Sequence, residues 1–311
     1  MQVHNGWENL PSFENVILTI GTYDGVHFGH QQIIKRINDL AKANQSESVL
    51  LTFHPHPRLV LRPDLELKLI TTIEEKVKLL ANYGIDHIVI APFSKEFASI
   101  PAELYVKDVL VKNFMPKKIV IGYDHKFGAE RKGDIDLLRK LAKDFHYEVE
   151  EISKQTIDDL SVSSTKVRKA ILEGDIEAAN ELLAHPFSLS GEVVHGEKRG
   201  RQLGFPTANI EINNPHKLIP PAGVYAIKSK INKESYNGLL SIGSKPTFGE
   251  YNEQFVEAYF FDFKQDIYGQ EIKVTLIGKV RNEMKFDSKD ALVAQMKEDV
   301  KIGKEKYFCQ G

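Results

Sequence analysis

The sequence predicts an α/β domain with a parallel sheet, followed by an antiparallel β-barrel. In the first half, short β-branched segments alternate with helical patterns, which is typical of βαβ units around a parallel sheet. In the second half, the apolar period changes to two, and turns rich in Gly, Pro and Asn separate the segments, as in a barrel. The length of 311 residues also suits two domains better than one.

The first domain is expected to hold five strands with helices between them. One helix, TTIEEKVKLLANYG, has chemical support at both ends. Thr72 and Glu75 have the spacing of a capping box, and Gly84 stands where a C-terminal glycine belongs. The expected strands are NVILTIG, SVLLTF, DHIVIAPF, KKIVIG and YEVEEIS.

Two consecutive helices, STKVRKAILEG and DIEAANELLAHP, are expected after the last of these strands. The change of rhythm that follows them predicts domains at residues 1–184 and 185–311. A final helix with Ser288 as its N-cap should pack against the barrel. The expected barrel strands are FSLSGEVV, TANIEI, GVYAIKSKI, YNGLLSIG, QFVEAYFFDF and EIKVTLIGKV.

The composition favours a cytoplasmic enzyme and excludes several other classes. Hydrophobic residues make up 42% and charged residues 27%, close to the averages of globular domains. The formal net charge of -2 lacks the basic excess of nucleic-acid binders, so a nucleic-acid partner is not expected. No apolar run has the length of a membrane span, and the single cysteine, Cys309, excludes an internal disulfide framework. The oligomeric state stays open.

A candidate phosphate site lies in GTYDGVHFGH, residues 21–30, where the first of these strands meets its helix. Glycines allow close backbone approach, and a helix N-terminus offers free N–H groups to an anion. His27 and His30 are three residues apart, so both rings can face one phosphate and donate hydrogen bonds to its oxygens. Alone, such a pair is more often a helix cap and a surface residue, so context must decide.

Three further motifs supply that context: TFHPHP at 52–57, IGYDHKFG at 121–128 and SVSSTKVR at 161–168. Together with the HxGH segment they resemble the bacterial bifunctional riboflavin kinase and FMN adenylyltransferase (FAD synthetase) family, whose N-terminal domain is nucleotidyltransferase-like. A Ser-Ser-Thr before a helix is by itself commonly a plain N-cap. The resemblance implies that the charge of the transferring AMP group is stabilised by His27, His30 and Arg168. It implies ATP contacts at Gly21, Asp24, Gly29, Ser163, Ser164 and Thr165.

The same resemblance implies flavin contacts in the first domain at His54, Pro57, Asp124 and Phe127. For His54 and Pro57, a strand end with a proline turn is an equally good interpretation. The chain departs from the family at His125, where a Phe is usual, and this changes the chemistry of the expected contact.

The second domain opens with GEVVHGEKRGRQLGFPTANI, residues 191–210. No Walker A pattern occurs in the sequence, so a kinase here must hold phosphates in another way. The segment resembles the flavokinase module, although PTAN alone would also fit a turn before a strand. The resemblance implies Mg²⁺ as the cofactor, with ATP contacts at Gly196 and Gly200, metal ligands at Thr207 and Asn209, and a flavin contact at Arg281.

Glu257 is the candidate base of the kinase. It lies in QFVEAYFF, where the neighbouring residues are apolar or aromatic, and a carboxylate in such company is costly unless it is solvated, paired or functional. The pattern alone favours a solvent-facing strand residue, whereas the resemblance implies that Glu257 accepts the proton of the riboflavin 5′-hydroxyl.

The expected function is therefore phosphorylation of riboflavin to FMN and adenylylation of FMN to FAD, with ATP as co-substrate of both steps. Two alternatives remain. The N-terminal motifs alone would permit a nucleotidyltransferase for another acceptor, against which the PTAN segment speaks. A flavin-binding protein that has lost one chemistry would retain riboflavin without forming a product.

Overall fold

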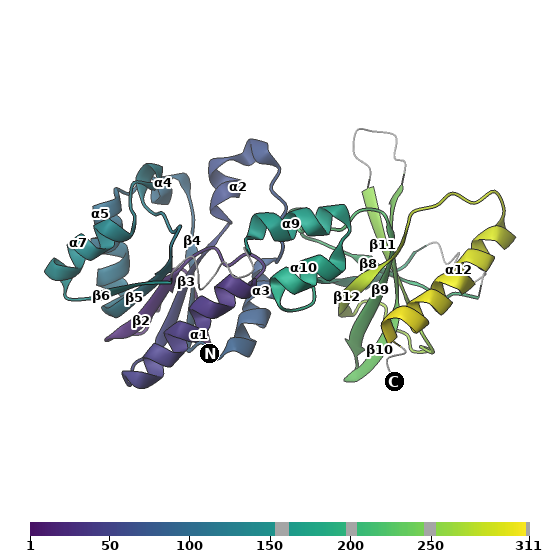
Figure 1. The fold of residues 1–311 in the computed structure, drawn as a ribbon, viewed down its shortest axis with the longest axis horizontal. Helices are drawn as coiled ribbons and strands as arrows, with labels where there is room; N and C mark the ends of the chain where they lie inside the picture. The colour runs from purple at the N-terminus through teal and green to yellow at the C-terminus, as the bar shows by residue number, and fades with distance from the viewer. Residues whose placement is uncertain (153–161, 197–203, 246–252, 309–311) are drawn as a thin grey trace. The chain divides into compact units, whose positions relative to one another are not determined.

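The computed structural model describes residues 1–152, 162–196, 204–245 and 253–308 (Figure 1). It divides into two compact units, Met1–Ser164 and Thr165–Gly311. The helices expected before the barrel, α9 (Ser164–Glu173) and α10 (Ile176–Leu183), therefore group almost entirely with the second unit. The boundary at 184/185, which follows the change of strand rhythm, stays a prediction.

A parallel sheet of six strands forms the centre of the first unit, in the order β1-β4-β3-β2-β5-β6. It confirms the predicted fold class and the expected strands, and it adds β1 at one edge. The strands are β1 (Gln2–Asn5), β2 (Val16–Ile20), β3 (Ser48–His54), β4 (His87–Pro92), β5 (Pro116–Gly122) and β6 (Glu148–Ile152).

Helices cover both faces of this sheet. Successive strand residues point to opposite faces: Ile17 packs with Ile33 and Ile37 of α1, whereas Leu18 packs with Val106 and Phe114. The central strand β2 is accordingly buried along its whole length, as its continuous apolar run predicts. The helices are α1 (Phe28–Ala43), α2 (Pro57–Leu61), α3 (Ile73–Leu80), α4 (Lys95–Ala98), α5 (Ala102–Leu104), α6 (Lys112–Phe114) and α7 (Ile135–Phe145). Short helical turns are η1 (Pro63–Leu65), η2 (Ala81–Tyr83), η3 (Tyr105–Val111) and η4 (Ala129–Arg131).

Helix α3 has the ends that its sequence predicts. The Thr72 side chain accepts a hydrogen bond from the Glu75 N–H, and the Glu75 carboxylate accepts one from the Thr72 N–H, which completes the capping box. The next turn, η2, ends at Gly84 with φ of 74°, a left-handed conformation that glycine adopts without strain.

The order of strands places the loops after β2 and β5 side by side. From β2 the chain proceeds through β3 and β4 on one side of the sheet, and then returns to build β5 and β6 on the other. In such sheets ligands bind at the carboxyl ends of the strands, where this order reverses. The segments predicted from HxGH and IGYDHKFG follow these two strands, so the topology brings them to one edge.

The second unit contains a closed barrel of antiparallel strands in the order β10-β11-β8-β7-β12-β9, which confirms the predicted barrel. Helix α10 is fastened to it, because Asn180 Nδ2 donates to the Leu276 carbonyl at 3.0 Å and Asn180 Oδ1 accepts from the Phe187 N–H at 2.7 Å. The strands are β7 (Ser188–Val194), β8 (Ala208–Glu211), β9 (Gly223–Ile231), β10 (Glu234–Lys245), β11 (Glu253–Phe260) and β12 (Glu271–Asn282).

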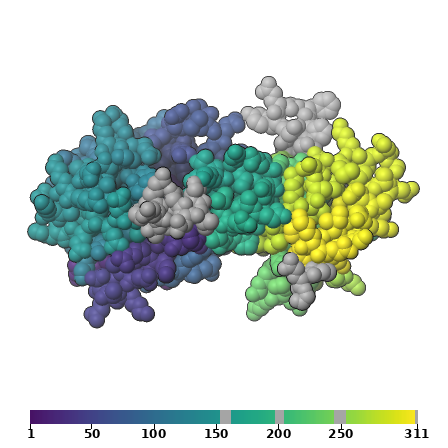
Figure 2. Space-filling view, viewed as in Figure 1, coloured from purple at the N-terminus to yellow at the C-terminus, as the bar shows by residue number. Residues whose placement is uncertain are grey.

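A terminal helix, α12 (Lys289–Gly303), packs on the barrel as predicted and continues into η5 (Lys304–Phe308). The Ser288 hydroxyl caps it by accepting a hydrogen bond from the Ala291 N–H at 3.1 Å. Val300 packs against buried Leu239 and Phe261 of the barrel. In the space-filling view the yellow residues of this region lie on part of the near surface of the second unit, beside green residues (Figure 2).

Candidate active sites

The loop between β2 and α1 has a strained backbone. Tyr23, Gly25 and Val26 have positive φ values of 48°, 83° and 42°. Each non-glycine residue in this region costs about 1–3 kcal/mol, and such residues are found where the surroundings enforce a functional geometry. The contacts around this loop are therefore the first evidence for how the site is held.

His27 and His30 lie together at the start of α1. His27 is the N-cap residue, and its Nδ1 accepts from the His30 N–H at 3.4 Å. The two rings stack with centroids 3.6 Å apart, and Tyr23 lies 4.8 Å from His30. Burial, and then the charges of His27 and Lys76, hold the pKa of His30 well below its ordinary value. His30 is therefore a neutral imidazole at a helix N-terminus, where an anion is favoured.

Asp24 is buried in the same loop, and its carboxylate binds the protein backbone. It accepts hydrogen bonds from the N–H groups of Ile70 and Thr71 at 3.2 and 3.0 Å, and from the Thr71 hydroxyl at 3.3 Å. The Thr71 hydroxyl also accepts from the Gly25 N–H at 3.0 Å. These bonds anchor the loop, and the ATP contact expected of Asp24 stays a prediction.

The glycines and the Ser-Ser-Thr segment frame this loop. A Cβ on Gly21 would lie 3.0 Å from the Tyr23 ring, so the ring packs closely over that backbone. Gly29 is buried in the first turn of α1. Ser164, the first residue of α9, donates from its hydroxyl to the Asp24 carbonyl at 3.0 Å, which brings the two predicted motifs together.

For the remaining residues of the SVSSTKVR segment, the predicted ATP contacts and charge stabilisation stay predictions. Ser163 precedes α9 and is half-buried. Thr165 is exposed, and Arg168 is half-buried one turn further along the helix; both belong to the second unit.

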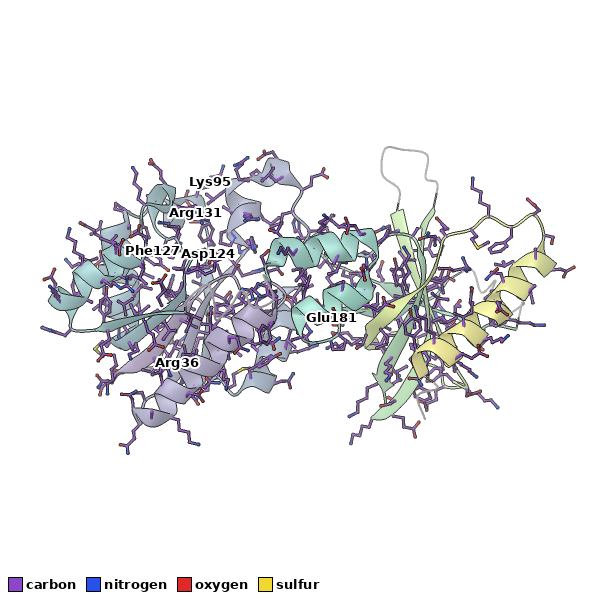
Figure 3. The ribbon with its side chains drawn as sticks, in the orientation of Figure 1. Arg36, Lys95, Asp124, Phe127, Arg131 and Glu181 are labelled. Atoms are coloured by element: carbon purple, nitrogen blue, oxygen red, sulfur yellow. The ribbon has the colours of Figure 1, made fainter. Side chains whose placement is uncertain are left out.

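The flavin residues predicted in the first unit lie at the carboxyl ends of β3 and β5. His54 ends β3 and is exposed, and Pro57 is the first residue of α2. The loop after β5 carries exposed Asp124 and buried Phe127, with Arg131 nearby (Figure 3). The sheet topology explains why these ends share one edge.

Phe127 lies in an aromatic cluster that was not predicted from the sequence. Its ring lies 5.5 Å from Tyr105, which lies 5.9 Å from Phe97. Phe97 in turn packs against Phe53 and Phe93 at 5.9 and 5.6 Å. The sequence offers one indication of this cluster, the aromatic residues of APFSKEF at the end of β4. That these residues lie close to the loop after β5 follows only from the fold.

His125, the departure from the family pattern, is an uncharged ring in this structure. It lies 6.0 Å from Phe127 with an interplanar angle of 28°, and its buried Nε2 has no hydrogen-bond partner among the residues that the structure describes. Burial, assisted by the charge of Arg131, lowers the pKa of His125 to about 4. The ring therefore keeps the aromatic, neutral character of Phe and adds a polar atom.

The candidate kinase site lies where β8 pairs with β11. Asn209 is opposite Glu257 in the ladder, and the Thr207 hydroxyl donates to the Glu257 carboxylate at 3.4 Å. Gly196 packs on the Asn209 side chain, because an added Cβ would meet its Nδ2 at 2.1 Å. The fold thus brings together four of the predicted kinase residues, whereas Gly200 lies outside the described part of the chain.

The oxygen atoms at this site suit Mg²⁺. The Thr207 hydroxyl and the Asn209 amide oxygen are hard ligands, and Mg²⁺ usually keeps several waters and few protein ligands. Within the described ranges, no cluster of three or more His, Cys, Asp or Glu side chains could hold a metal by itself. Thr207 and Asn209 therefore fit an ion that shares its coordination with phosphate oxygens and water.

Arg281, the predicted flavin contact of the barrel, forms an ion pair within the second unit. Its Nε and Nη2 each donate to the Asp299 carboxylate at 2.8 Å, and Asp299 is only 3% exposed. Such bidentate pairs fix geometry strongly. This pair fastens β12 to α12, and a flavin contact of Arg281 stays a prediction.

Comparisons with known proteins match both units. The family model for FAD synthetase matches residues 10–166, and the model for riboflavin kinase matches residues 183–307. A bifunctional riboflavin kinase/FMN adenylyltransferase of Listeria monocytogenes is 38% identical over 92% of this chain and 90% of the relative. The protein of that name from Buchnera aphidicola is 39% identical over 99% of both chains.

A solved structure has the same fold. It is described as a macrolide-efflux protein from Streptococcus pneumoniae, is 32% identical, and matches with a TM-score of 0.87 over 97% of this chain and 98% of that one. Among the described residues of the present chain, no helix has the length and apolar character needed to cross a membrane. Both family models and the near full-length relatives lead to one conclusion: the chain belongs to the bifunctional riboflavin kinase/FMN adenylyltransferase family.

Proposed function

We propose that the chain phosphorylates riboflavin to FMN in its second unit and transfers AMP from ATP to FMN in its first. The observation that carries this proposal is that two separate family models each cover a candidate phosphate site. The stacked histidines belong to the first match, and the Thr207–Glu257 pair belongs to the second. A cytoplasmic location is part of the same proposal and rests on composition alone.

In the adenylyl transfer, a phosphate oxygen of FMN attacks the α-phosphorus of ATP and pyrophosphate leaves. The imidazoles of His27 and His30 donate hydrogen bonds to the oxygens that gain charge, and Arg168 contributes a guanidinium. No covalent enzyme intermediate is needed. Positioning and electrostatic stabilisation therefore account for most of the rate enhancement.

In the kinase step, Glu257 accepts the proton of the riboflavin 5′-hydroxyl as that oxygen attacks the γ-phosphorus of ATP. The Thr207 hydroxyl orients the Glu257 carboxylate through their hydrogen bond. Thr207 and Asn209 would hold Mg²⁺, which neutralises phosphate charge when it is bound.

The test is a time course of the purified chain with riboflavin, ATP and Mg²⁺, with the flavins separated by chromatography. FMN should appear before FAD. Riboflavin that stays bound without any product would contradict the proposal and would favour a flavin-binding protein without catalytic activity. In a parallel reaction with FMN in place of riboflavin, formation of FAD, combined with no FMN from riboflavin, would support only the activity of the first unit.

A further inference from the structure

Lys76 of α3 is a buried charge beneath the HxGH loop. It is only 5% exposed, and its Nζ donates to the Thr22 carbonyl at 2.7 Å and to the Thr52 hydroxyl at 3.3 Å. Removing an ammonium group from water is expensive unless its hydrogen bonds are satisfied. The two hydrogen bonds offset that cost and tie α3 to the residues that lead into the loop.

The contacts of Lys76 converge on the residue that enters the strained loop. The Thr22 carbonyl also accepts from the Thr52 hydroxyl at 3.2 Å, so this one oxygen is held from both α3 and the end of β3. Thr22 immediately precedes Tyr23, whose φ is 48°. Lys76 therefore fixes the point at which the chain turns towards His27 and His30.

Lys76 also adds to the lowering of the His30 pKa, after burial and the charge of His27. The groups that face His30 are the stacked His27 ring, the Tyr23 ring and the Lys76 charge. Lys76 in turn faces the Asp24 carboxylate; burial lowers the pKa of Lys76 to about 8, and Asp24 opposes that shift. Near neutral pH, Lys76 is thus mainly charged, and its charge disfavours protonation of His30.

We infer that Lys76 is a positioning residue for adenylyl transfer: its ammonium group holds the Thr22 carbonyl, and with it the histidine loop. The inference rests on the proposed function of the first unit. Lys76 acts through the loop and not on the substrate.

The experiment compares Lys76→Met with Lys78→Met, the same substitution at an exposed position on the same helix. The rate of FAD formation from FMN and ATP is measured for the full-length chain as a function of pH. For Lys76→Met we expect kcat to fall on the order of a hundredfold with little change in KM, because displacement of a catalytic loop costs about that much. Lys78→Met should match the wild type.

Two readouts separate this role from a merely structural one. Without the Lys76 charge, protonation of His30 becomes easier, so the acid limb of the Lys76→Met profile should move to higher pH. The thermal unfolding midpoint checks that the variant stays folded at the assay temperature, because loss of the ammonium group leaves the Thr22 carbonyl with the Thr52 hydroxyl as its side-chain donor. Riboflavin phosphorylation by the same variant should be unchanged.

A second variant, Thr52→Val, removes one partner of the ammonium group but keeps its charge. Its FAD formation should fall on the order of tenfold, as for a lost hydrogen bond to a charged group, without any shift of the acid limb. Near-normal FAD formation by Lys76→Met with a wild-type pH profile would overturn the inference. Absence of FAD formation by the wild type would instead refute the proposed function of the first unit.

Discussion

Replacement of Glu257 by Gln should abolish most of the kinase activity and leave the fold intact. Gln has the same shape, and its amide oxygen still accepts the hydrogen bond that the Thr207 hydroxyl donates at 3.4 Å. A bond of that kind contributes about 1 kcal/mol, so its retention should keep the unfolding free energy near that of the wild type. The amide, however, is unable to take a proton.

The expected loss follows from that difference. Removal of a general base lowers turnover by roughly 10²- to 10⁴-fold. Riboflavin binding should change much less, because the amide oxygen still accepts a hydrogen bond from the 5′-hydroxyl. FAD formation from supplied FMN should be unaffected, since its chemistry is assigned to the other unit.

The assay is a pair of rates on one variant, riboflavin to FMN and FMN to FAD, with circular dichroism as the check of folding. Glu192→Gln provides a matched control, because Glu192 is an exposed residue of β7 in the same barrel. An exposed strand glutamate should change stability by no more than about 0.5 kcal/mol and leave turnover normal. If folded Glu257→Gln behaves like that control, Glu257 is not the base.

Three further predictions concern which unit carries which activity and how FAD formation depends on pH. His27→Ala combined with His30→Ala should lower FMN adenylylation by at least about a hundredfold and spare riboflavin phosphorylation, and unchanged FAD formation would refute the assignment. A fragment 185–311 should retain kinase activity and form no FAD, and a folded but inactive fragment of this length would contradict a self-contained kinase. The longer fragment 165–311 should unfold at a higher temperature, because it keeps the hydrogen bonds between α10 and the barrel. Wild-type FAD formation should decline as pH rises through about 8, where Lys76 loses its proton and its hydrogen bond to Thr22 weakens, and the same decline in Lys76→Met would show that another group is responsible.

The sequence predicted the features that depend on residues close together in the chain. The Thr72–Glu75 capping box and the Ser288 cap are local hydrogen bonds between side chain and backbone, so a few residues specify each of them. The parallel strands were visible as apolar runs bounded by turns. Strand β1 was not predicted, because its residues are mostly exposed and do not form an apolar run. It is defined by its pairing with β4 at the edge of the sheet.

Contacts between distant residues were not predictable in this way. The ATP contact of Asp24 stays a prediction, and the hydrogen bonds that Asp24 accepts from Ile70 and Thr71, which are remote in sequence, were not foreseen. The flavin contact of Arg281 likewise stays a prediction, and its ion pair with Asp299 of α12 was not foreseen. A charged residue in a motif has several candidate partners, and only the fold decides which of them lies within reach.

The loop after β2 depends on residues close in sequence and on residues far apart in sequence. The sequence therefore predicts the HxGH motif but not the residues that hold the loop in place. HxGH is a local pattern, because consecutive residues specify both the start of the helix and the two histidines three residues apart. The strained backbone that presents those rings is held by Lys76 from α3 and Thr52 from β3, each of which looks ordinary in its own segment. Since a strained loop persists only where its surroundings enforce it, substitutions at these supporting residues should affect catalysis without touching the substrate.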